Sequence, residues 1–590
     1  MIIDYNIPLT NSISSFLKTT YKVDVKTFEF QTTKKDFDGD ITLQVFPLLK
    51  LIKTNPEKLA DGIGEYLLKT NEIVTTYNTV KGFLNITLSD NYYLDQFRSI
   101  YKQVNYGHKI ATKNAPEIMV EFSSPNTNKP LHLGHVRNIL LGDSVSRIFE
   151  EVGNKVHKTQ IINDRGIHIC KSLIAWNKFG NNSNPKNENI KGDVFVGNYY
   201  VLYNKEYEKQ VNKLISDGHD KKHAEQNAEI LLEAKDLLRK WENGDEEVIK
   251  QWEKLNSWVY EGFSKTYSDL NVKFDSEYFE SKTYLKGKEI VIDGLNKNIF
   301  KKKEDNSIWI DLTNDGLDEK ILLRSDGTSV YITQDIGTAF LRYKDHPKMD
   351  GMIYTTGNEQ DYHFKVLFEV LNKLGYPWAD KLSHLSYGMV DLPSGKMKSR
   401  EGTVVDADEL IEEMNQKAKS ISESLGKVNH LNDSNQLKLF NDIALGALKY
   451  HILKVDPKKR ILFDPNESID FNGNTGPFIQ YTYARIQSLL RKNTNKKSFK
   501  NISISEKERN IIIQLNDYPN VLLNAYSNLN PSLIANYVYD LVKLYNSFYQ
   551  SHTVLGNNEI NSFRILLSKK VGEYIKKSMS LLGVSVPNRM

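Results

Sequence analysis

The spacing of apolar side chains changes along the chain, and each spacing predicts a type of element. Residues 58–70 carry apolar side chains at helical spacing, whereas residues 82–90 alternate as a strand does. Residues 112–116 end in proline and are typical of a linker. We therefore predict a small α+β domain over residues 1–110.

Beyond this linker the pattern is strand, loop, helix, strand. Residues 117–126 begin as a buried strand, 136–153 form an amphipathic helical pattern that ends at Gly153, and 155–164 are typical of a strand. Such a βαβ unit joins parallel strands. Strand-like runs resume at 321–339 and 351–360, and residues 384–405 form a strand followed by a glycine- and lysine-bearing loop. We therefore predict a Rossmann-like parallel sheet within residues 111–405.

Helical patterns interrupt and follow this predicted sheet. An Asn-rich loop covers 181–189, and residues 198–270 are charged and helical, with aromatic residues at helix-like spacing. We interpret residues 181–295 as an insertion between two halves of the sheet. After residue 406 nearly all of the chain is helical in pattern, which predicts a helical connecting segment over 406–465 and an all-α bundle over 466–590.

The composition narrows the class of protein. The chain has 590 residues, of which 39% are hydrophobic and 26% charged, as in soluble globular proteins. A single cysteine, Cys170, excludes an internal disulfide and a multi-cysteine metal site. The start lacks a signal-peptide pattern, and no apolar run approaches the roughly 18 residues of a membrane helix. We expect a cytoplasmic protein that does not enter a membrane.

Charge is unevenly distributed. The net charge is +4, but residues 476–590 contain 15 lysines and arginines against 6 acidic residues. A basic module on a slightly acidic body favours a polyanionic partner at that end. A solvated lysine-rich surface is an equally good interpretation of charge alone.

The first motif whose residues could bind a ligand is Pro130-Leu131-His132-Leu133-Gly134-His135, between a predicted strand and a predicted helix. Backbone N–H groups at a helix start favour an anion, usually phosphate, and both histidines can donate hydrogen bonds. A metal site is the weaker alternative, because no nearby cysteine or glutamate completes it. Two structural histidines are the other alternative.

The second motif is the basic loop 396–402, with Lys396, Lys398 and Arg400 in five residues. Such a loop can neutralise charge on a departing phosphate, although an exposed basic turn has the same composition. The chain has no GxxxxGK[ST] motif, and the glycines at 62 and 64 lack the third glycine of a dinucleotide-binding motif. A P-loop ATPase and a dehydrogenase are therefore poor interpretations.

A third group comprises acids and polar residues near the predicted sheet: Glu121, Asn126, Tyr331, Asp335 and Gln360. A carboxylate such as Asp335 can hold a guanidinium group with two hydrogen bonds. Spacing alone does not show whether these five residues converge.

Residues 132–135 and 396–400 resemble the two signatures of class I aminoacyl-tRNA synthetases. Segments 120–138, 471–488 and 581–590, together with 82–89, resemble arginyl-tRNA synthetases, and the resemblance covers essentially the whole chain. It implies an arginine–tRNA ligase, an enzyme that forms arginyl-adenylate from ATP and releases pyrophosphate. It then transfers arginine to the 2′-hydroxyl of the terminal adenosine of tRNA(Arg).

The resemblance also implies tRNA-dependent activation, Mg²⁺ that accompanies ATP, no structural metal held by the protein, and a monomer. The N-terminal domain would contact the outer corner of the tRNA, and the C-terminal bundle its anticodon.

The resemblance assigns roles residue by residue. It implies that ATP is bound by His132, Gly134, His135, Met389, Lys396 and Ser399, with His132, His135, Lys129 and Lys396 as catalytic residues. It implies arginine binding by Glu121, Ser124, Asn126, Tyr331, Asp335 and Gln360. The basic surface for tRNA includes Arg491, Lys492, Lys496 and Lys497, while Tyr549 and Met590 would shape the anticodon pocket, unless Tyr549 is a core residue.

Two positions depart from the family pattern. Ser399 stands where class I loops usually have their second lysine, and we hypothesise that Lys129 compensates together with Lys396. Arg165 stands where the family often has tryptophan, and the sequence assigns it no role. A class I synthetase for another amino acid and a non-catalytic tRNA-binding paralogue remain as alternatives.

Overall fold

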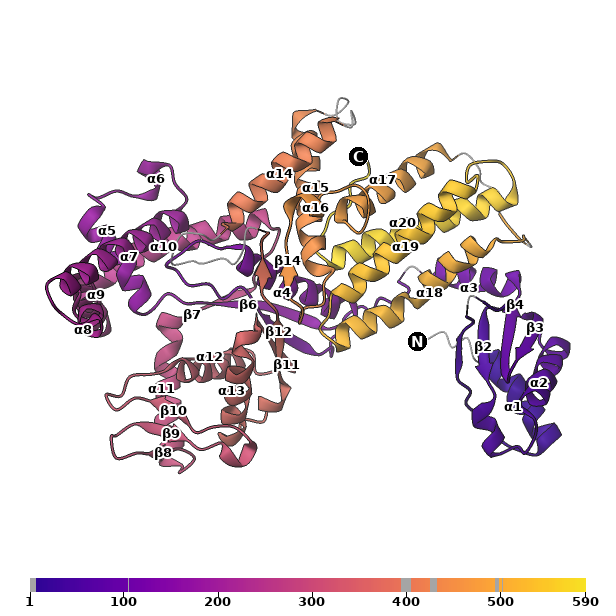
Figure 1. The fold of residues 1–590 in the computed structure, drawn as a ribbon, viewed down its shortest axis with the longest axis horizontal. Coiled ribbons are helices and arrows are strands. Elements are labelled where there is room, and N and C mark those ends of the chain that lie inside the picture. Colours follow the sequence, from indigo (N-terminus) through magenta and orange to yellow (C-terminus); the bar gives the residue numbers. More distant parts are fainter. Residues whose placement is uncertain are drawn as a thin grey trace. The chain divides into compact units, whose positions relative to one another are not determined.

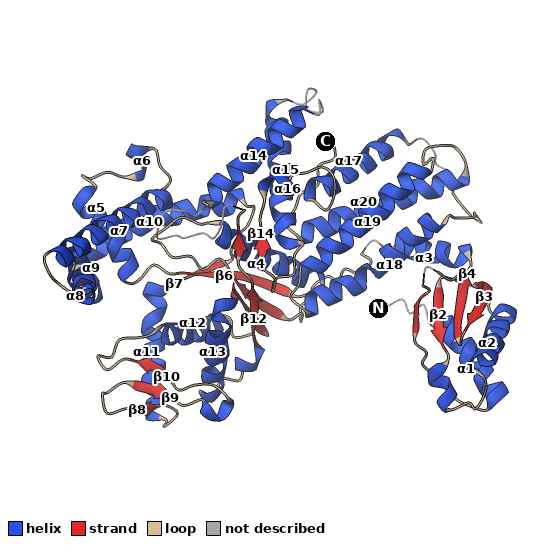
Figure 2. Cartoon of the chain, in the orientation of Figure 1, coloured by secondary structure: helices blue, strands red, loops and turns tan. Residues whose placement is uncertain are grey.

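The structure is a computed structural model that describes residues 7–34, 36–103, 105–393, 405–424, 432–493, 498–500 and 502–590. The chain forms two compact units. The first comprises Met1–His108, Arg485–Leu523 and Tyr537–Ile575, and the second comprises Lys109–Ala484, Asn524–Asn536 and Lys576–Met590. Figure 1 traces the chain through both units, and Figure 2 shows its helices and strands.

The first unit begins with an α+β region. Its antiparallel sheet has the order β1-β2-β4-β3. These strands are β1 (Phe30–Thr32), β2 (Ile41–Gln44), β3 (Val74–Val80) and β4 (Phe83–Leu88). Helix α2 (Pro56–Thr70) packs on β3, α1 (Ile7–Tyr21) packs on α2, and α3 (Asp90–Lys102) follows β4. The helix predicted over 58–70 and the strand predicted over 82–90 are confirmed.

The second unit contains a parallel sheet with the strand order β12-β11-β5-β6-β7. Its strands are β5 (Glu117–Glu121), β6 (Lys155–Ile162), β7 (Ser276–Phe279), β11 (Gly351–Gly357) and β12 (Leu382–Tyr387). From β5 the chain runs outward through β6 to β7, and it then returns to the other side of β5 with β11. The predicted Rossmann-like sheet is confirmed, and its topological switch point lies between β5 and β11, where ligands bind in such folds.

Helix α4 (Leu133–Glu151) connects β5 to β6 and is buried along most of its length. It approaches the end of β5 closely, because a Cβ atom on Gly142 would lie 2.2 Å from the ring of Phe122. Glycine at this position therefore lets the helix pack tightly against the sheet. The chain after residue 580 contacts two helices. Ser144 of α4 donates to the carbonyl of Leu581, and Lys449, in the helix Asp433–Leu453, donates to that of Gly583.

A helical excursion separates β6 from β7. It comprises α5 (Ile167–Phe179), α6 (Pro185–Glu188), α7 (Gly192–Ser216), α8 (Lys221–Asn227), α9 (Glu229–Glu242) and α10 (Glu246–Asp269). The charged helical pattern predicted over 198–270 is confirmed. Strand β7 lies inside the predicted insertion 181–295 but pairs with β6, so the chain rejoins the sheet before that range ends.

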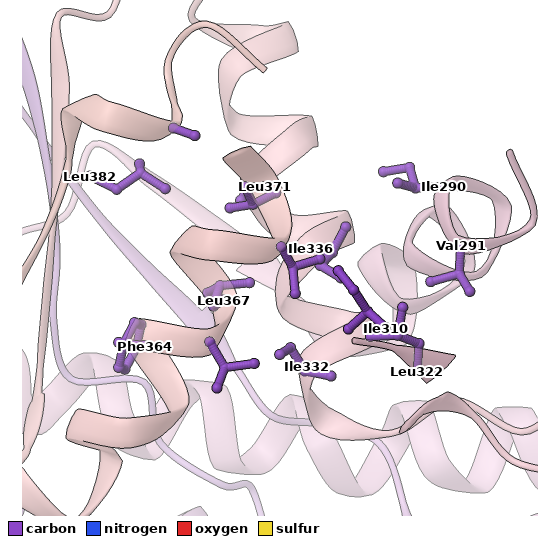
Figure 3. Packing of buried hydrophobic residues seen from close by; sticks show 14 of the residues in the cluster. Ile290, Val291, Ile310, Leu322, Ile332, Ile336, Phe364, Leu367, Leu371 and Leu382 are labelled. Carbon is purple, nitrogen blue, oxygen red and sulfur yellow. The ribbon is translucent and has the colours of Figure 1, made fainter. Parts of the chain in front are cut away.

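Between β7 and β11 the chain builds a small layered region. Its antiparallel sheet contains β8 (Lys301–Lys302), β9 (Ile308–Ile310) and β10 (Lys320–Leu323), beside α11 (Glu280–Asn296) and α12 (Tyr331–Asp345). Figure 3 shows the apolar cluster that joins these helices to α13 (Asp361–Lys373), with Ile336 and Leu367 among its members. The strand-like interpretation of 321–339 is wrong beyond residue 323, because residues from Tyr331 onward form α12.

After residue 406 the described chain is helical apart from β14 (Ile461–Leu462), which pairs with β13 (Val390–Asp391). The helices are α14 (Ala407–Ser424), α15 (Asp433–Leu453), α16 (Pro465–Ser468), α17 (Gly476–Lys492), α18 (Glu506–Ser527), α19 (Ser532–Ser551) and α20 (Glu559–Leu581). The predicted helical C-terminal region is confirmed. In the described part of the chain, no helix combines the length and apolarity needed to cross a membrane.

Candidate active site

A cavity of about 570 Å³ opens at the switch point of the parallel sheet. Its walls come from the loop after β5, the start of α4, the segment after β11 and the segment from β12 to β13. Six of the residues implied by the family resemblance line it: Ser124, His132, Gly134, His135, Gln360 and Met389. The other lining residues are Ser123, Asn138, Thr356, Gly357, Glu359, Tyr387, Val390, Asp391 and Arg460.

His132 and His135 cap the first turn of α4 reciprocally. The Nδ1 atom of His132 accepts the backbone N–H of Gly134 at 3.1 Å, and Nδ1 of His135 accepts the backbone N–H of His132 at 3.1 Å. Burial, aided by Lys129, lowers the pKa of His132 to about 3, and burial lowers that of His135 well below its usual value. Both rings are therefore neutral and carry their proton on Nε2. Each offers a fixed, uncharged donor to an anion in the cavity.

Gly134 leaves no room for a side chain. A Cβ atom there would lie 2.9 Å from Cε1 of His132, so any larger residue would displace the ring that lines the cavity. The start of α4 also presents the positive end of the helix dipole. This combination is suited to bind phosphate.

The chain makes a strained turn where β5 ends at the cavity. Ser123 has φ +74° and Ser124 has φ +46°, a left-handed region that non-glycine residues rarely occupy. Asn138 on α4 holds this turn, because its Oδ1 accepts the N–H of Ser123 at 2.5 Å and its Nδ2 donates to the carbonyl of Thr355 on β11. Asn138 has no recognisable signal in the sequence, yet it joins the two strands of the switch point to α4.

Glu121 is paired inside the protein. It is 5% exposed and forms an ion pair with Arg342, which is fully buried on α12. Its other oxygen accepts the hydroxyl of Ser124 at 3.1 Å. Glu121 does not line the cavity, so its predicted contact with a substrate guanidinium group competes with an internal one.

A second acidic group surrounds the start of α12. Tyr331 is 77% exposed at the first turn, and Asp335 follows one turn later. The Nε2 atom of His363 lies 2.6 Å from Oδ2 of Asp335. Glu280, the first residue of α11, is buried, and burial together with Asp164 and Asp335 raises its pKa to about 7 although Arg165 opposes this. Neither Glu280 nor His363 was recognised as a candidate from the sequence pattern.

Arg165, for which the sequence assigned no role, ties the loop after β6 to the helical excursion. Its guanidinium group bonds Glu242 of α9 at 2.5 Å and stacks over the ring of Tyr284 of α11 at 4.0 Å. Its neighbour Asp164 is buried and accepts the N–H and hydroxyl of Ser281. These two residues fix the start of α11, and with it Glu280.

The remaining predicted catalytic and substrate-binding residues either do not line the main cavity or lie outside the described residues. Lys129 and His132 both line an adjacent cavity of about 170 Å³. Asn126 is exposed and forms a parallel bridge with Asn163. Lys396 and Ser399, with Lys398 and Arg400, lie outside the described residues. A cation missed by the sequence analysis, Arg460, lines the main cavity and bonds Asp391.

Of the residues predicted to bind tRNA, Arg491 and Lys492 are exposed in the last turn of α17. Tyr549 on α19 is half-buried, with the guanidinium group of Arg485 5.5 Å from the centre of its ring. Met590 is partly exposed at the chain end. Lys496 and Lys497 lie outside the described residues.

The parallel sheet and the cavity at its switch point fit a class I aminoacyl-tRNA synthetase. A family model described as tRNA synthetases class I (R), catalytic domain, matches residues 96–464. Models of the DALR anticodon binding domain and the arginyl tRNA synthetase N terminal domain match residues 479–590 and 8–88. The chain belongs to the arginyl-tRNA synthetase family.

Curated relatives agree over the full length. Arginine–tRNA ligases of Flavobacterium psychrophilum and Phocaeicola vulgatus are 53% and 52% identical, each over 99% of both chains. Among solved structures, arginyl-tRNA synthetase of Thermus thermophilus has a TM-score of 0.75 at 24% identity and covers 99% of this chain and 100% of its own. That of Plasmodium falciparum has a TM-score of 0.73 at 23% identity, with 99% and 98% covered, and both show the same fold.

Proposed function

We propose that the protein ligates L-arginine to tRNA(Arg) in two steps. The carboxylate of arginine attacks the α-phosphate of ATP, which gives arginyl-adenylate and pyrophosphate. The 2′-hydroxyl of the terminal adenosine of the tRNA then takes the arginyl group and releases AMP. Neither step uses a protein nucleophile, so catalysis consists of positioning and charge stabilisation.

The observation that carries this proposal is the pair of neutral histidines at the start of α4. A capping box fixes both rings, so their Nε2–H donors cost no reorganisation when phosphate charge develops. Gly134 keeps this wall open for a flat ligand, and Met389 and Gln360 line the same cavity. We place ATP here, with Lys396, Ser399 and Lys129 completing the contacts to its phosphates as the resemblance implies.

The acidic residues at the starts of α12 and α11 would bind the arginine side chain. Asp335 presents a carboxylate, Glu280 presents a second, and Tyr331 stands one turn before Asp335. A guanidinium cation satisfies these acids, whereas a neutral analogue leaves them unpaired. Ser124, Asn126 and Gln360 would hold the α-amino and carboxylate end, which must face the α-phosphate of ATP.

Several further assignments belong to the same proposal. Residues 1–110 and 466–590 contact the tRNA, 111–405 bind the small substrates with the helices α5 to α10 as an insertion, and 406–465 connect them. Arg491 and Lys492 contact phosphates, while Tyr549 and Met590 shape the anticodon pocket. If Mg²⁺ accompanies ATP, phosphates and water would supply most of its ligands, and the carboxylates of Glu359 and Asp391 at the cavity would offer oxygen ligands of the kind it prefers. We place the enzyme in the cytoplasm as a monomer.

ATP–pyrophosphate exchange tests the proposal, with arginine or lysine as the amino acid and with or without total tRNA. We expect exchange with arginine only, and only when tRNA is present. Exchange with lysine would overturn the arginine pocket while keeping the class. No exchange in any mixture, with tRNA binding intact, would favour a non-catalytic tRNA-binding protein.

Two substitutions test the residue assignments. Asp335→Asn is expected to raise the KM for arginine, whereas the matched control Asp345→Asn, an exposed residue at the end of the same helix, should leave it unchanged. Lys129→Ala should slow exchange, because a lost contact to phosphate costs at least about 1 kcal/mol. A rate within about twofold of the wild type would remove Lys129 from the mechanism.

A further inference from the structure

His363 contacts the proposed arginine-binding acid directly. Its Nε2 lies 2.6 Å from Oδ2 of Asp335, and a carboxylate can only accept, so the imidazole donates. The His363 side chain is 25% exposed and that of Asp335 is 36% exposed. The contact is therefore partly shielded from water but open to a ligand. In the free protein, one carboxylate oxygen of Asp335 therefore already accepts a hydrogen bond from His363.

The charged groups around His363 determine its protonation. Asp335 on α12 raises the pKa of His363 against the opposing effect of burial. From β12, His384 faces the same region, but burial lowers its pKa, and its two nitrogens meet Thr356 and Asp361. On α11, burial and the nearby charge of Asp335 raise the pKa of Glu280. The free site thus holds an imidazole that retains its proton more readily than usual and a carboxyl group that does the same.

A bound guanidinium group favours the deprotonated forms of both His363 and Glu280. Arginine stays charged at every accessible pH, so its arrival beside Asp335 adds a cation that repels an imidazolium and stabilises a carboxylate. The proton on His363 and the proton on Glu280 are then both expelled to solvent. Two cations would otherwise share one carboxylate.

We propose that His363 is a positioning residue that orients Asp335 and releases its proton when arginine binds, so that substrate recognition is coupled to deprotonation. This inference rests on the proposed function, because it takes Asp335 as the guanidinium ligand. Since protons are released on binding, arginine affinity rises with pH as His363 and Glu280 lose their protons and is constant above that range. The coupling selects for a permanent cation, because a neutral amino acid of similar shape displaces no proton.

Three variants of the full chain separate the two parts of this role. His363→Gln keeps an amide donor near the position of Nε2 but cannot be protonated, and His363→Ala removes the donor as well. His223→Gln, at an exposed histidine on α8, is the matched control. Arginine binding is measured by calorimetry at pH 6, 7 and 8 in buffers of different ionisation enthalpy, which gives both the affinity and the number of protons released.

We expect the wild type and His223→Gln to release protons and to lose about tenfold in arginine affinity from pH 8 to pH 6. His363→Gln should release fewer protons, depend less on pH, and bind within about threefold of the wild type at pH 8. His363→Ala should bind about tenfold more weakly at pH 8, with kcat within about twofold, since the donor to Asp335 is lost. This recovery with Gln but not Ala distinguishes positioning of Asp335 from general packing.

Wild-type proton release in His363→Gln would overturn the inference, as would equal affinities of the Gln and Ala variants. Asp335→Asn, measured in parallel, tests the proposed function separately. If Asp335→Asn leaves arginine affinity unchanged, the pocket assignment itself fails. If it weakens arginine while His363→Gln behaves as the wild type, only the role of His363 is refuted.

Discussion

Replacing Glu121 by glutamine distinguishes two roles for this side chain. The family resemblance implies that Glu121 binds the substrate, whereas the structure pairs its carboxylate with Arg342 in the core. Arg342 is fully buried, and its Nε and Nη2 atoms have no hydrogen-bond partner among the described residues. The charge of Glu121 is therefore the main compensation for this guanidinium group. Glu121→Gln keeps the shape of the side chain and removes that compensation.

Breaking a buried ion pair from one side costs about 3–5 kcal/mol, because the remaining charge stays desolvated. We expect a loss of this size for Glu121→Gln, and a similar loss for Arg342→Met, which strands the carboxylate. The double variant removes both charges. Since an uncharged replacement of a buried pair is often neutral or stabilising, the double variant should recover most of the lost free energy of unfolding.

Urea unfolding of the four proteins, followed by circular dichroism, gives the coupling energy of the pair. The KM for arginine is measured in parallel at a temperature where every variant is folded. The argument is refuted if Glu121→Gln loses less than about 1 kcal/mol of stability and raises the KM for arginine more than about tenfold. That result would place Glu121 against the substrate, as the resemblance implies.

Three further predictions concern other parts of the chain. Gly134→Ala places a methyl group 2.9 Å from Cε1 of His132, so kcat/KM for ATP in pyrophosphate exchange should fall at least about tenfold, and an unchanged value would contradict the packing. Burial lowers the pKa of Lys449 to about 8, below that of an unfolded lysine. The unfolded chain therefore binds more protons between pH 8 and 10, and wild-type stability should rise over this range by up to about 3 kcal/mol relative to Lys449→Met, with parallel curves as the contrary result. Arg491→Gln and Lys492→Gln should each reduce the slope of log K for tRNA against log salt by about 1, measured by filter binding, and an unaltered slope would remove that residue from the interface.

The parts of the fold that follow from local pattern were predictable. Residues 117–126, 136–153 and 155–164 give β5, α4 and β6 because the apolar side chains of each segment follow a recognisable local pattern over a short stretch. The prediction for residues 331–339 was wrong because it relied on local pattern alone. Their β-branched and aromatic side chains favour a strand, but tertiary packing makes them helical. Gly287 of α11 and Gly337 of α12 let these helices touch, since a Cβ atom on Gly337 would lie 2.4 Å from the backbone nitrogen of Gly287.

The candidate site was predictable only where its residues form a contiguous motif. His132, Gly134 and His135 sit within four positions, and their capping geometry follows from that spacing. Glu121 lies 221 residues from Arg342, and no local pattern reveals that the two are partners. Asn138 and His363 likewise owe their roles to contacts with residues distant in sequence, so no local sequence pattern distinguishes them.

The two acids of the predicted arginine pocket illustrate why residue type alone underdetermines function. Glu121 and Asp335 are both carboxylates beside a cationic partner, but Glu121 faces a fixed guanidinium in the core while Asp335 faces an imidazole that can lose its proton. A buried arginine remains charged and does not leave, so part of the accepting capacity of Glu121 is already used inside the protein. Histidine can give up its charge near neutral pH, so Asp335 can exchange one cation for another. We therefore expect the partner, rather than the acid, to determine which carboxylate binds arginine more readily.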